Sequence, residues 1–231
     1  MWKRAAAIAV ILCWSTPAKA HWNAPSEVVH GTAFTLEEGE FVFGLLSPIA
    51  YGASDSITFI THPVMWLLLT PNASIRWRLN DMDNLSIALN LDVTQTLSLD
   101  DESSAQLDPR PQGQYNLGFS GSLALGSRVI LSAGTGYQRD VSPDNNKWAF
   151  SAGATVLFSP VHMLLLQGAA TTTLEKSEIE DTHVMLMYAH AWDSVRASVG
   201  LAYGQFPIVL GEQEEAVEVP IWPVLDIWWR F

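Results

Sequence analysis

The chain has 231 residues, of which 24 are acidic and 12 are basic, so its formal net charge at pH 7 is −12. A surface this acidic repels phosphate backbones, which makes nucleic acid an unsuitable partner. Cys13 is the single cysteine, and it lies within the first twenty residues. The rest of the chain therefore contains no disulfide, no thiol nucleophile and no cysteine metal ligand.

Residues 1–20 contain the three parts of a secretory signal peptide. Lys3-Arg4 gives a positive start, residues 5–14 are apolar, and Ala18-Lys19-Ala20 matches the small-x-small cleavage pattern. The apolar run is about half of the roughly 20 residues that a membrane-spanning helix needs. We therefore expect export, cleavage after residue 20 and a mature domain of residues 21–231, with a buried N-terminal helix as the alternative.

From residue 27 onward, apolar and polar residues alternate in runs that end in turn residues, which is the pattern of β-strands. In Asn84–Leu99 every second residue from Leu85 onward is apolar except Gln95, and the residues between them are small or polar. The polar faces are rich in Ser, Gly, Ala and Thr but poor in Lys and Glu. The runs approach the 9–11 residues that a tilted strand needs to cross a bilayer. Both features favour a membrane barrel over a soluble β-sandwich.

Turn lengths indicate the topology. The short connections are 52–55, 80–83, 126–127, 159–161 and 193–194, and they alternate with the longer connections 100–113, 140–146, 175–182 and 205–220. Outer-membrane barrels place short turns in the periplasm and longer loops outside. Eleven strands follow from Glu40 onward, and Val28–Leu36 would supply one more. We predict an all-β fold, a transmembrane antiparallel up-and-down β-barrel of about 12 strands. Ten is the fallback, because Pro48 and Pro63 interrupt the second and third strands.

The last residues are Asp226-Ile227-Trp228-Trp229-Arg230-Phe231, with Leu225, Ile227, Trp229 and Phe231 on one face of a strand. This ending resembles the C-terminal signature of bacterial outer-membrane β-barrel proteins, in which assembly machinery recognises a terminal Phe preceded by alternating apolar residues. The resemblance covers only the last strand. It implies the outer membrane of a Gram-negative-type bacterium and makes Ile227, Trp229 and Phe231 the assembly signal. Its implied partners are the barrel assembly machinery, outer-membrane lipid and lipopolysaccharide.

The cost of charge in lipid sets the direction in which each strand faces. Slipping the last strand by one residue would move Asp226 and Arg230 into the bilayer, where Arg costs roughly 2–4 kcal/mol at the midplane. By this argument the charges that face the bore are Glu40, Arg76, Arg78, Asp92, Arg196 and Asp226. They are interpreted either as ion pairs that brace the wall or as a charged constriction that selects solutes.

Several apolar residues also fall on inward positions, namely Ile60, Val64, Trp66, Leu68, Met163, Leu165, Met185 and Met187. They would either line a passage for hydrophobic compounds or pack the bore. The longer loops carry a different cluster, an acidic mouth made by Asp100, Asp101, Glu102, Glu178, Glu180, Asp181, Glu212, Glu214, Glu215 and Glu218. Such a mouth would attract cations, or hold divalent ions beside lipopolysaccharide, or simply be a solvated surface.

The sequence shows no linear catalytic or metal-binding motif: no Gly-x-Ser-x-Gly elbow and no His-Glu-x-x-His spacing. We predict no catalytic residue, no metal and no cofactor. The predicted function is a narrow passive pore or transporter for small or hydrophobic solutes. The alternatives are a structural or adhesive barrel with a closed bore, and an outer-leaflet lipid-modifying enzyme, for which His183 near Asp181 is the least unsuitable candidate.

Overall fold

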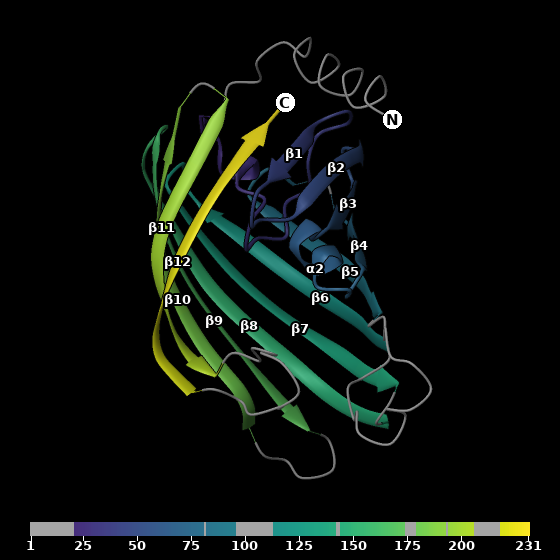
Figure 1. The fold of residues 1–231 in the computed structure, drawn as a ribbon. Helices are drawn as coiled ribbons and strands as arrows, with labels where there is room; N and C mark the ends of the chain where they lie inside the picture. The colour runs from purple at the N-terminus through teal and green to yellow at the C-terminus, as the bar shows by residue number, and fades with distance from the viewer. Residues whose placement is uncertain are drawn as a thin grey trace, which may run out of the picture.

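The computed structural model describes residues 21–80, 82–95, 113–141, 144–173, 179–192, 194–205 and 218–231. These residues form twelve antiparallel strands in one closed barrel, in which β1 pairs with β12 and every other strand pairs with its neighbours in sequence (Figure 1). The predicted fold class is confirmed. The strands are β1 Phe41–Gly44, β2 Ile49–Ser54, β3 Ile57–Thr61, β4 Asn72–Arg78, β5 Leu85–Gln95, β6 Gly113–Leu125, β7 Val129–Val141, β8 Asp144–Ser159, β9 His162–Thr173, β10 Ile179–Ala191, β11 Val195–Gln205 and β12 Glu218–Arg230.

Val28–Leu36 is not a strand, so that expectation was wrong. The segment follows a short 3-10 helix, η1 (Pro25–Glu27), and lies inside the barrel. The twelfth strand arises instead at Pro48, which separates β1 from β2 where one continuous strand was expected. Proline lacks the N–H that a ladder inside a sheet requires, so the chain turns there.

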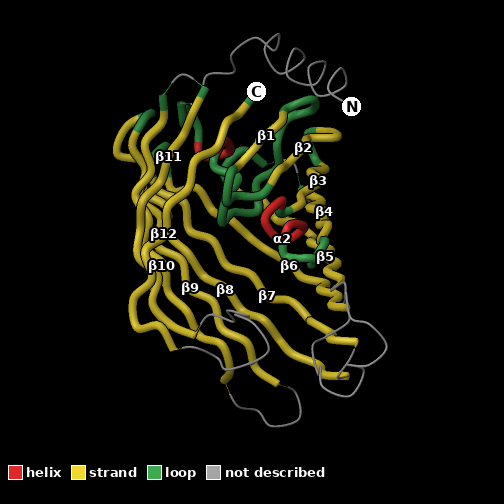
Figure 2. The backbone as a smooth tube through the Cα atoms, viewed as in Figure 1, coloured by secondary structure: helices red, strands yellow, loops and turns green. Residues whose placement is uncertain are grey.

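Pro63 also ends a strand that was expected to continue. β3 stops at Thr61, and Pro63 becomes the first residue of the short helix α2 (Pro63–Leu67). Proline suits that position because its fixed φ is helical and its missing N–H would have no partner in the first turn. The chain then returns directly into β4 (Figure 2).

The wall of the barrel differs in height around its circumference. Strands β5 to β12 have 11–16 residues, whereas β1 to β4 have only 4–7. A tilted strand needs about 9–11 residues to cross a bilayer. The four short strands lie at the end of the barrel where the C-terminus lies (Figure 1), so on this side the described strands complete the wall only over that half.

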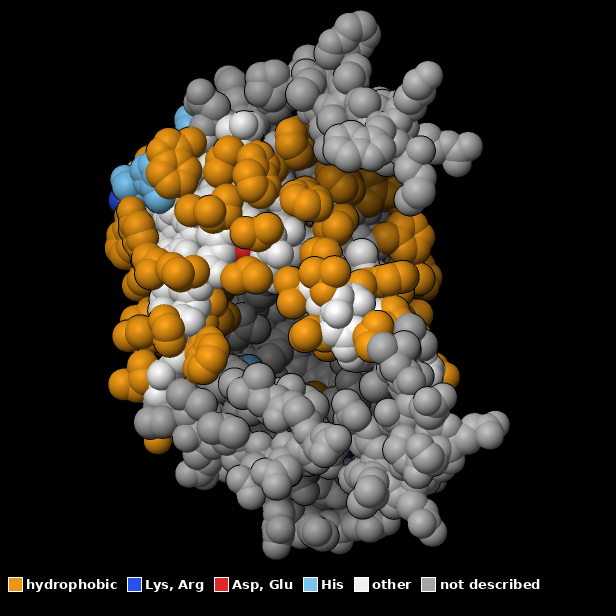
Figure 3. Space-filling view, viewed as in Figure 1, with side chains coloured by type: hydrophobic (Ala, Val, Ile, Leu, Met, Phe, Trp, Pro, Cys, Tyr) orange, Lys and Arg blue, Asp and Glu red, His pale blue; other side chains and the backbone are white. Residues whose placement is uncertain are grey.

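The outer surface of the barrel is covered with apolar side chains (Figure 3). Tyr51, Leu117 and Leu201 are each about half exposed, and similar side chains lie on nearly every strand. A continuous apolar band of this extent is unfavourable in water but suits lipid. Among the described residues, no helix combines the length and apolarity needed to span a membrane.

The lipid-facing register predicts the effect of a charge on the outer wall. Leu186 lies near the middle of β10 and is 46% exposed. Leu186→Arg should lower the free energy of unfolding in phospholipid vesicles by about 2–4 kcal/mol. Ser151→Arg is the control, because Ser151 lines the interior and lies near the middle of β8. Equal losses in urea titrations of the two variants would contradict this register.

Candidate functional site

The bore is filled at one end by residues 22–37, here called the inner segment. Its apolar side chains Val28, Phe34 and Leu36 are at most 2% exposed. They belong to the same buried cluster as wall residues such as Ile130 and Trp228. The interior of this half of the barrel is therefore a packed hydrophobic core, formed by the chain's own N-terminal region and the inward face of the wall.

Small polar side chains of the wall bind the backbone of the inner segment. The Ser122 hydroxyl accepts a hydrogen bond from the Ala33 N–H at 2.8 Å, and the Ser86 hydroxyl donates to the Ala33 carbonyl at 2.8 Å. Thr58 Oγ1 accepts from the Leu36 N–H at 2.9 Å. These three hydroxyls come from β6, β5 and β3, so the segment is held from several strands. Each bond satisfies a backbone group that would otherwise be buried without a partner.

Two further features bring the inner segment close to the wall. Gly52 in β2 has no side chain, and a Cβ there would lie 1.9 Å from the Glu37 carbonyl oxygen. The Gly52 N–H donates to the Glu40 carbonyl at 2.9 Å, and the Gly39 N–H donates to the Gly52 carbonyl at 2.9 Å. At the other end of the segment, the Trp22 N–H donates to the Pro160 carbonyl at 2.7 Å.

Arg76 points into the bore and crosslinks the inner segment. Its Nη1 donates to the carbonyls of Val29 and Phe34, both at 3.0 Å, and its Nε donates to Asn90 at 3.3 Å. Asp92 also faces the interior, where it accepts a hydrogen bond from Asn116 at 2.9 Å. Arg76 therefore binds the segment, and Asp92 lines the space beyond it.

A charged cluster binds the start of the inner segment to the last two strands. Arg230 forms a bidentate ion pair with Glu40 at 2.7 Å and donates to the Glu27 carbonyl at 2.8 Å. Arg196 in β11 is 3% exposed, and its guanidinium lies 4.9 Å from the centre of the Trp22 ring. The arginines on these two strands thus hold the segment by charge-assisted hydrogen bonds and a cation–π contact.

His30 lies in the inner segment, with its ring centre 5.3 Å from that of Trp228. Burial, followed by the positive charges of Arg196 and Arg76, lowers the pKa of His30 to about 4. The imidazole is therefore neutral at pH 7 in this position, because a proton there would be poorly solvated and close to two guanidinium groups.

The two remaining predicted lumenal charges are Arg78 and Asp226. Arg78 is on the same face of β4 as Arg76, opposite Ala88 of β5. Asp226 lies between the barrel wall and the β1–β2 connection, and accepts hydrogen bonds from the backbone N–H groups of Leu46 at 3.1 Å and Ser47 at 3.0 Å. The predicted charges thus occupy two regions of the interior, and their role in selecting solutes stays a prediction.

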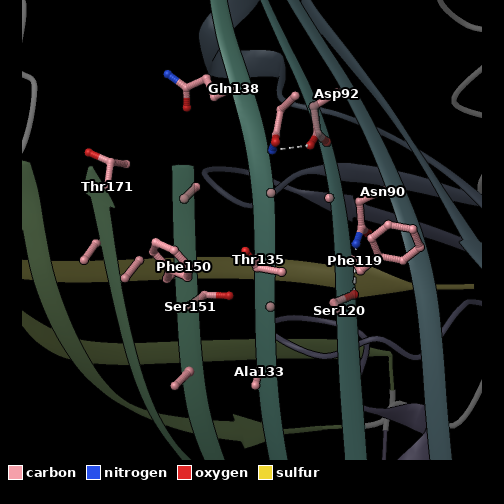
Figure 4. Close-up of a pocket in the computed structure, with 18 of the residues that line it drawn as sticks. Asn90, Asp92, Phe119, Ser120, Ala133, Thr135, Gln138, Phe150, Ser151 and Thr171 are labelled. Carbon is pink, nitrogen blue, oxygen red and sulfur yellow. Dashed lines mark hydrogen bonds between the residues drawn. The ribbon is translucent and has the colours of Figure 1, made fainter. Parts of the chain in front are cut away.

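Beyond the inner segment the bore widens into a first chamber of about 660 Å³. Gly31, Thr32 and Arg76 line it where it meets the segment, and the side walls come from the inward faces of β5 to β10. Figure 4 shows that these walls carry mostly small or polar side chains, among them Asn90, Asp92, Ser120, Gln138, Ser151 and Thr171. A volume of this size is typical of small-molecule sites.

A second chamber of about 420 Å³ lies toward the short strands. Its lining combines apolar side chains, among them Val42, Ala50, Ile60 and Met185, with polar ones such as His30, His62 and Ser74. The residues that line both chambers are Gly31, Arg76, Asn90, Asp92 and Gln167, so the two spaces meet at this polar row.

The apolar residues expected inside have separate locations. Ile60 and Met185 line the second chamber. Met163 and Leu165 are buried at 3% and 2%, and Met163 packs in the core with the inner segment. Trp66 and Leu68, expected inside on a continuous third strand, lie in and beside α2 and are more than half exposed.

Ser47, His62 and Asp226 come together beside the β1–β2 connection, although no linear motif links them. The Ser47 hydroxyl donates to the Asp226 carboxylate, and the same carboxylate lies close enough to His62 to oppose the lowering of the pKa of His62 by burial. A serine nucleophile needs its hydroxyl directed at an imidazole base. This hydroxyl is directed at the carboxylate, so the three residues have the bonding of a structural clamp.

Some predicted sites fall where the structure gives no side chains. Glu180 and Asp181 are in β10 and Glu218 begins β12, but only their backbone is described. The signal peptide at 1–20 and the remaining acidic-mouth residues Asp100, Asp101, Glu102, Glu178, Glu212, Glu214 and Glu215 lie outside the described residues. Among the described residues, no three His, Cys, Asp or Glu side chains form a group that could hold a metal ion.

The predicted assembly signal lies on the strand that closes the barrel. Phe231 and Phe41 exchange two backbone hydrogen bonds, at 2.9 and 3.0 Å. Ile227 is 40% exposed on the outer wall, and the Trp229 ring lies 6.1 Å from that of Phe43. Recognition of these residues by assembly machinery stays a prediction.

Comparison with known proteins supports the architecture. The barrel is similar to the solved structure of the NanC porin in a rhombohedral crystal form, with a TM-score of 0.57 and 5% sequence identity. The match covers 83% of this chain and 96% of the porin chain. No family model matches the sequence, and no curated protein does. At this identity the likeness concerns the fold alone.

The Glu40–Arg230 pair provides a test of how firmly β12 is joined to the residues between the inner segment and β1. The two side chains are 18% and 6% exposed, so Glu40→Gln would leave a buried guanidinium without its counter-charge. We expect a loss of about 3 kcal/mol in the free energy of unfolding, measured by urea titration in vesicles. Glu38→Gln, at an exposed neighbouring position, should change it by less than about 0.5 kcal/mol. Similar values for both variants would rule out a buried, paired Arg230.

Proposed function

We propose that this protein is an outer-membrane channel for small solutes whose passage is controlled by its own inner segment. In this proposal the turns and the C-terminus face the periplasm and the longer loops face outside, as in other outer-membrane barrels. The first chamber then opens outward, and the inner segment separates it from the periplasm. The observation that carries the proposal is a polar chamber of about 660 Å³ that ends at a segment of the same chain.

The way in which the inner segment is held supports a movable closure. It is bound by separate side-chain contacts: single hydrogen bonds with Ser86, Ser122 and Thr58, each worth about 0.5–1.5 kcal/mol net, the guanidinium groups of Arg76 and Arg230, and apolar packing. Water could take the place of the segment at each hydroxyl. The wall, by contrast, is held by a continuous ladder of backbone pairs from β1 round to β12. Release of the segment would therefore leave the barrel intact.

The proposed channel favours cations because of its acidic loops. Inside the first chamber, Arg76 and Lys147 are matched in number by Asp92 and Asp140, so the lining itself has no strong bias. Selectivity would come from the acidic mouth, with Glu212, Glu214 and Glu215 as its most concentrated part. The solute that crosses is small, because the space available to it is a narrow bore.

A barrel that acts through its loops, with no transport, is the second candidate. The closed bore favours it, since Val28, Phe34 and Leu36 of the inner segment are buried in one core cluster with residues of the wall. The two candidates differ in one property. The channel opens when the segment is released, whereas the structural barrel has no functional need of an open state.

Planar-bilayer recording separates these candidates. Residues 21–231 should give a closed baseline with infrequent current steps, whereas deletion of residues 22–36 should give sustained conductance because the strand ladder of the wall does not include the segment. In a KCl gradient, the reversal potential of the open state should indicate cation preference.

A variant that keeps the full chain length guards against misfolding of the deletion. Phe34→Asp with Leu36→Asp places two charges in the core and should also raise the open fraction, because a buried unpaired carboxylate is strongly disfavoured. If both variants insert and both remain closed, the bore is not a channel.

The channel should open more readily in acid. His30 has a pKa of about 4 when the inner segment is docked and an ordinary value of 6.5 when it is released. The released state therefore binds the proton more tightly, so docking is strongest above pH 6.5 and weakens as the pH falls toward 4. The open fraction of the intact protein should rise over this range. His30→Asn should remove most of the rise, and a profile unchanged by His30→Asn would exclude His30 as its cause.

A further inference from the structure

The barrel wall is incomplete on one side in the half away from the C-terminus. β12 pairs with β11 from Glu218 to Trp229, but pairs with β1 only over Trp228–Arg230. The strands β2 to β4 are also short, with 5–7 residues, and the connection through α2 returns to β4 without extending the wall. Among the described residues, most of β12 therefore has a strand neighbour on one side only (Figure 1).

The free side of β12 has the features of a permanent strand edge. The Ile227 carbonyl on this side accepts a hydrogen bond from the Leu45 N–H at 2.9 Å, and the Ile227 N–H donates to the Asp226 carboxylate at 2.8 Å. Backbone groups alternate in direction along a strand, so the backbone of Pro223, which precedes Ile227 by an even number of residues, points to the same side. Proline has no N–H, so this position leaves no donor unpaired at the edge. Lipid offers no hydrogen-bond partners to backbone groups. A strand edge with few unpaired N–H groups is therefore suited to border an opening in the wall.

The rim of the opening is apolar. Leu45 and Leu46 from the β1–β2 connection and Leu67 and Leu68 from the region of α2 are 53–83% exposed, and Leu225 on β12 is 61% exposed. Figure 3 shows the wall hollowed between such side chains. Side chains of this type are compatible with the hydrocarbon of a bilayer, so a molecule that moves from lipid into the opening meets a mainly apolar rim, at which the polar side chains of Ser47 and Asp226 are hydrogen-bonded to each other.

The second chamber lies behind this opening. Pro48 and His62, which flank the β1–β2 connection and α2, form part of its lining, and Ile60 and Met185 form apolar parts further inside. The chamber then meets the polar row at Arg76, which it shares with the first chamber. A path from lipid therefore passes the mainly apolar rim and the apolar side chains of the second chamber before it reaches the polar row.

We infer that this lateral opening admits an amphipathic molecule from the outer leaflet, with its apolar part in the second chamber and an uncharged, hydroxyl-rich head in the first. The head is uncharged because Arg76 and Lys147 are matched by Asp92 and Asp140 around it. Asn90, Asn116, Gln138, Ser120, Ser151 and Thr171 supply donors and acceptors suited to hydroxyl groups. The inference rests on the proposed function, because it names the substrate class of the same chambers.

The probe for this inference is octyl glucoside with a photoreactive diazirine in its alkyl chain. The protein, purified in a zwitterionic detergent, is placed in phosphatidylcholine vesicles, irradiated with the probe, and mapped by peptide mass spectrometry. Met185 faces the second chamber, whereas its neighbour Leu186 faces lipid, so the two positions report inner and outer labelling in one peptide. We expect both to be labelled.

Competition and substitution distinguish specific occupancy from general partitioning. Unlabelled octyl glucoside should lower labelling at Met185 by about tenfold and leave labelling at Leu186 largely unchanged, while glucose should affect neither. Ala50→Trp, which fills the second chamber, should act like the competitor, and Val199→Trp on the outer wall is its matched control.

Labelling confined to Leu186 and other outer residues would overturn the lateral path, and so would labelling of Met185 that the competitor leaves unchanged. The competition experiment on the unsubstituted protein decides the matter if Ala50→Trp fails to fold. These outcomes are independent of conductance. If the deletion of residues 22–36 conducts while Met185 stays unlabelled, the channel proposal stands and the lateral path is excluded. If Met185 is labelled in a protein that never conducts, the lateral path stands and the channel proposal is excluded.

Discussion

The structure depends on one constraint, the need to pair every backbone polar group that lipid would leave unsatisfied. The closed ladder from β1 round to β12 meets this need over the wall. Phe41 and Phe231 complete the ring through two backbone hydrogen bonds next to the C-terminus. Where the ladder stops, along the free side of β12, Pro223 and the Asp226 carboxylate limit the number of unpaired donors. The same constraint thus explains both the closed part of the wall and the form of its opening.

The constraint also accounts for the interior. A second chain segment inside a barrel brings its own backbone groups, and these require partners on the inner wall. Ser86, Ser122 and Thr58 provide them and are essentially fully buried. These strands differ from those of a soluble sheet in their small inward residues. At one end of the bore, such residues therefore bind the backbone of the inner segment. At the other end, residues of the same kind, such as Ser120 and Ser151, line an open chamber.

The sequence was sufficient to predict the barrel because alternation repeats in most strands and charge in lipid has a large cost. It was misleading for Val28–Leu36, which was expected to supply one of the twelve strands. That segment is apolar at adjacent positions, Val28-Val29 and Ala33-Phe34, which is typical of a chain buried on all sides. Pro48 and Pro63 were recognised as interruptions, but only the structure shows that they end strands. The lateral opening could not be predicted, because it follows from the three-residue pairing of strands at opposite ends of the chain.

The central claim is that the inner segment closes the bore and must leave it for solutes to pass. A disulfide between Ala33→Cys and Ser122→Cys tests this most directly, since the Ala33 N–H and the Ser122 hydroxyl are 2.8 Å apart and Cys13 is the chain's single cysteine. In planar bilayers the oxidised protein should show no current steps, and reduction should restore them in the same membrane. Equal conductance in the oxidised and reduced states would contradict the account.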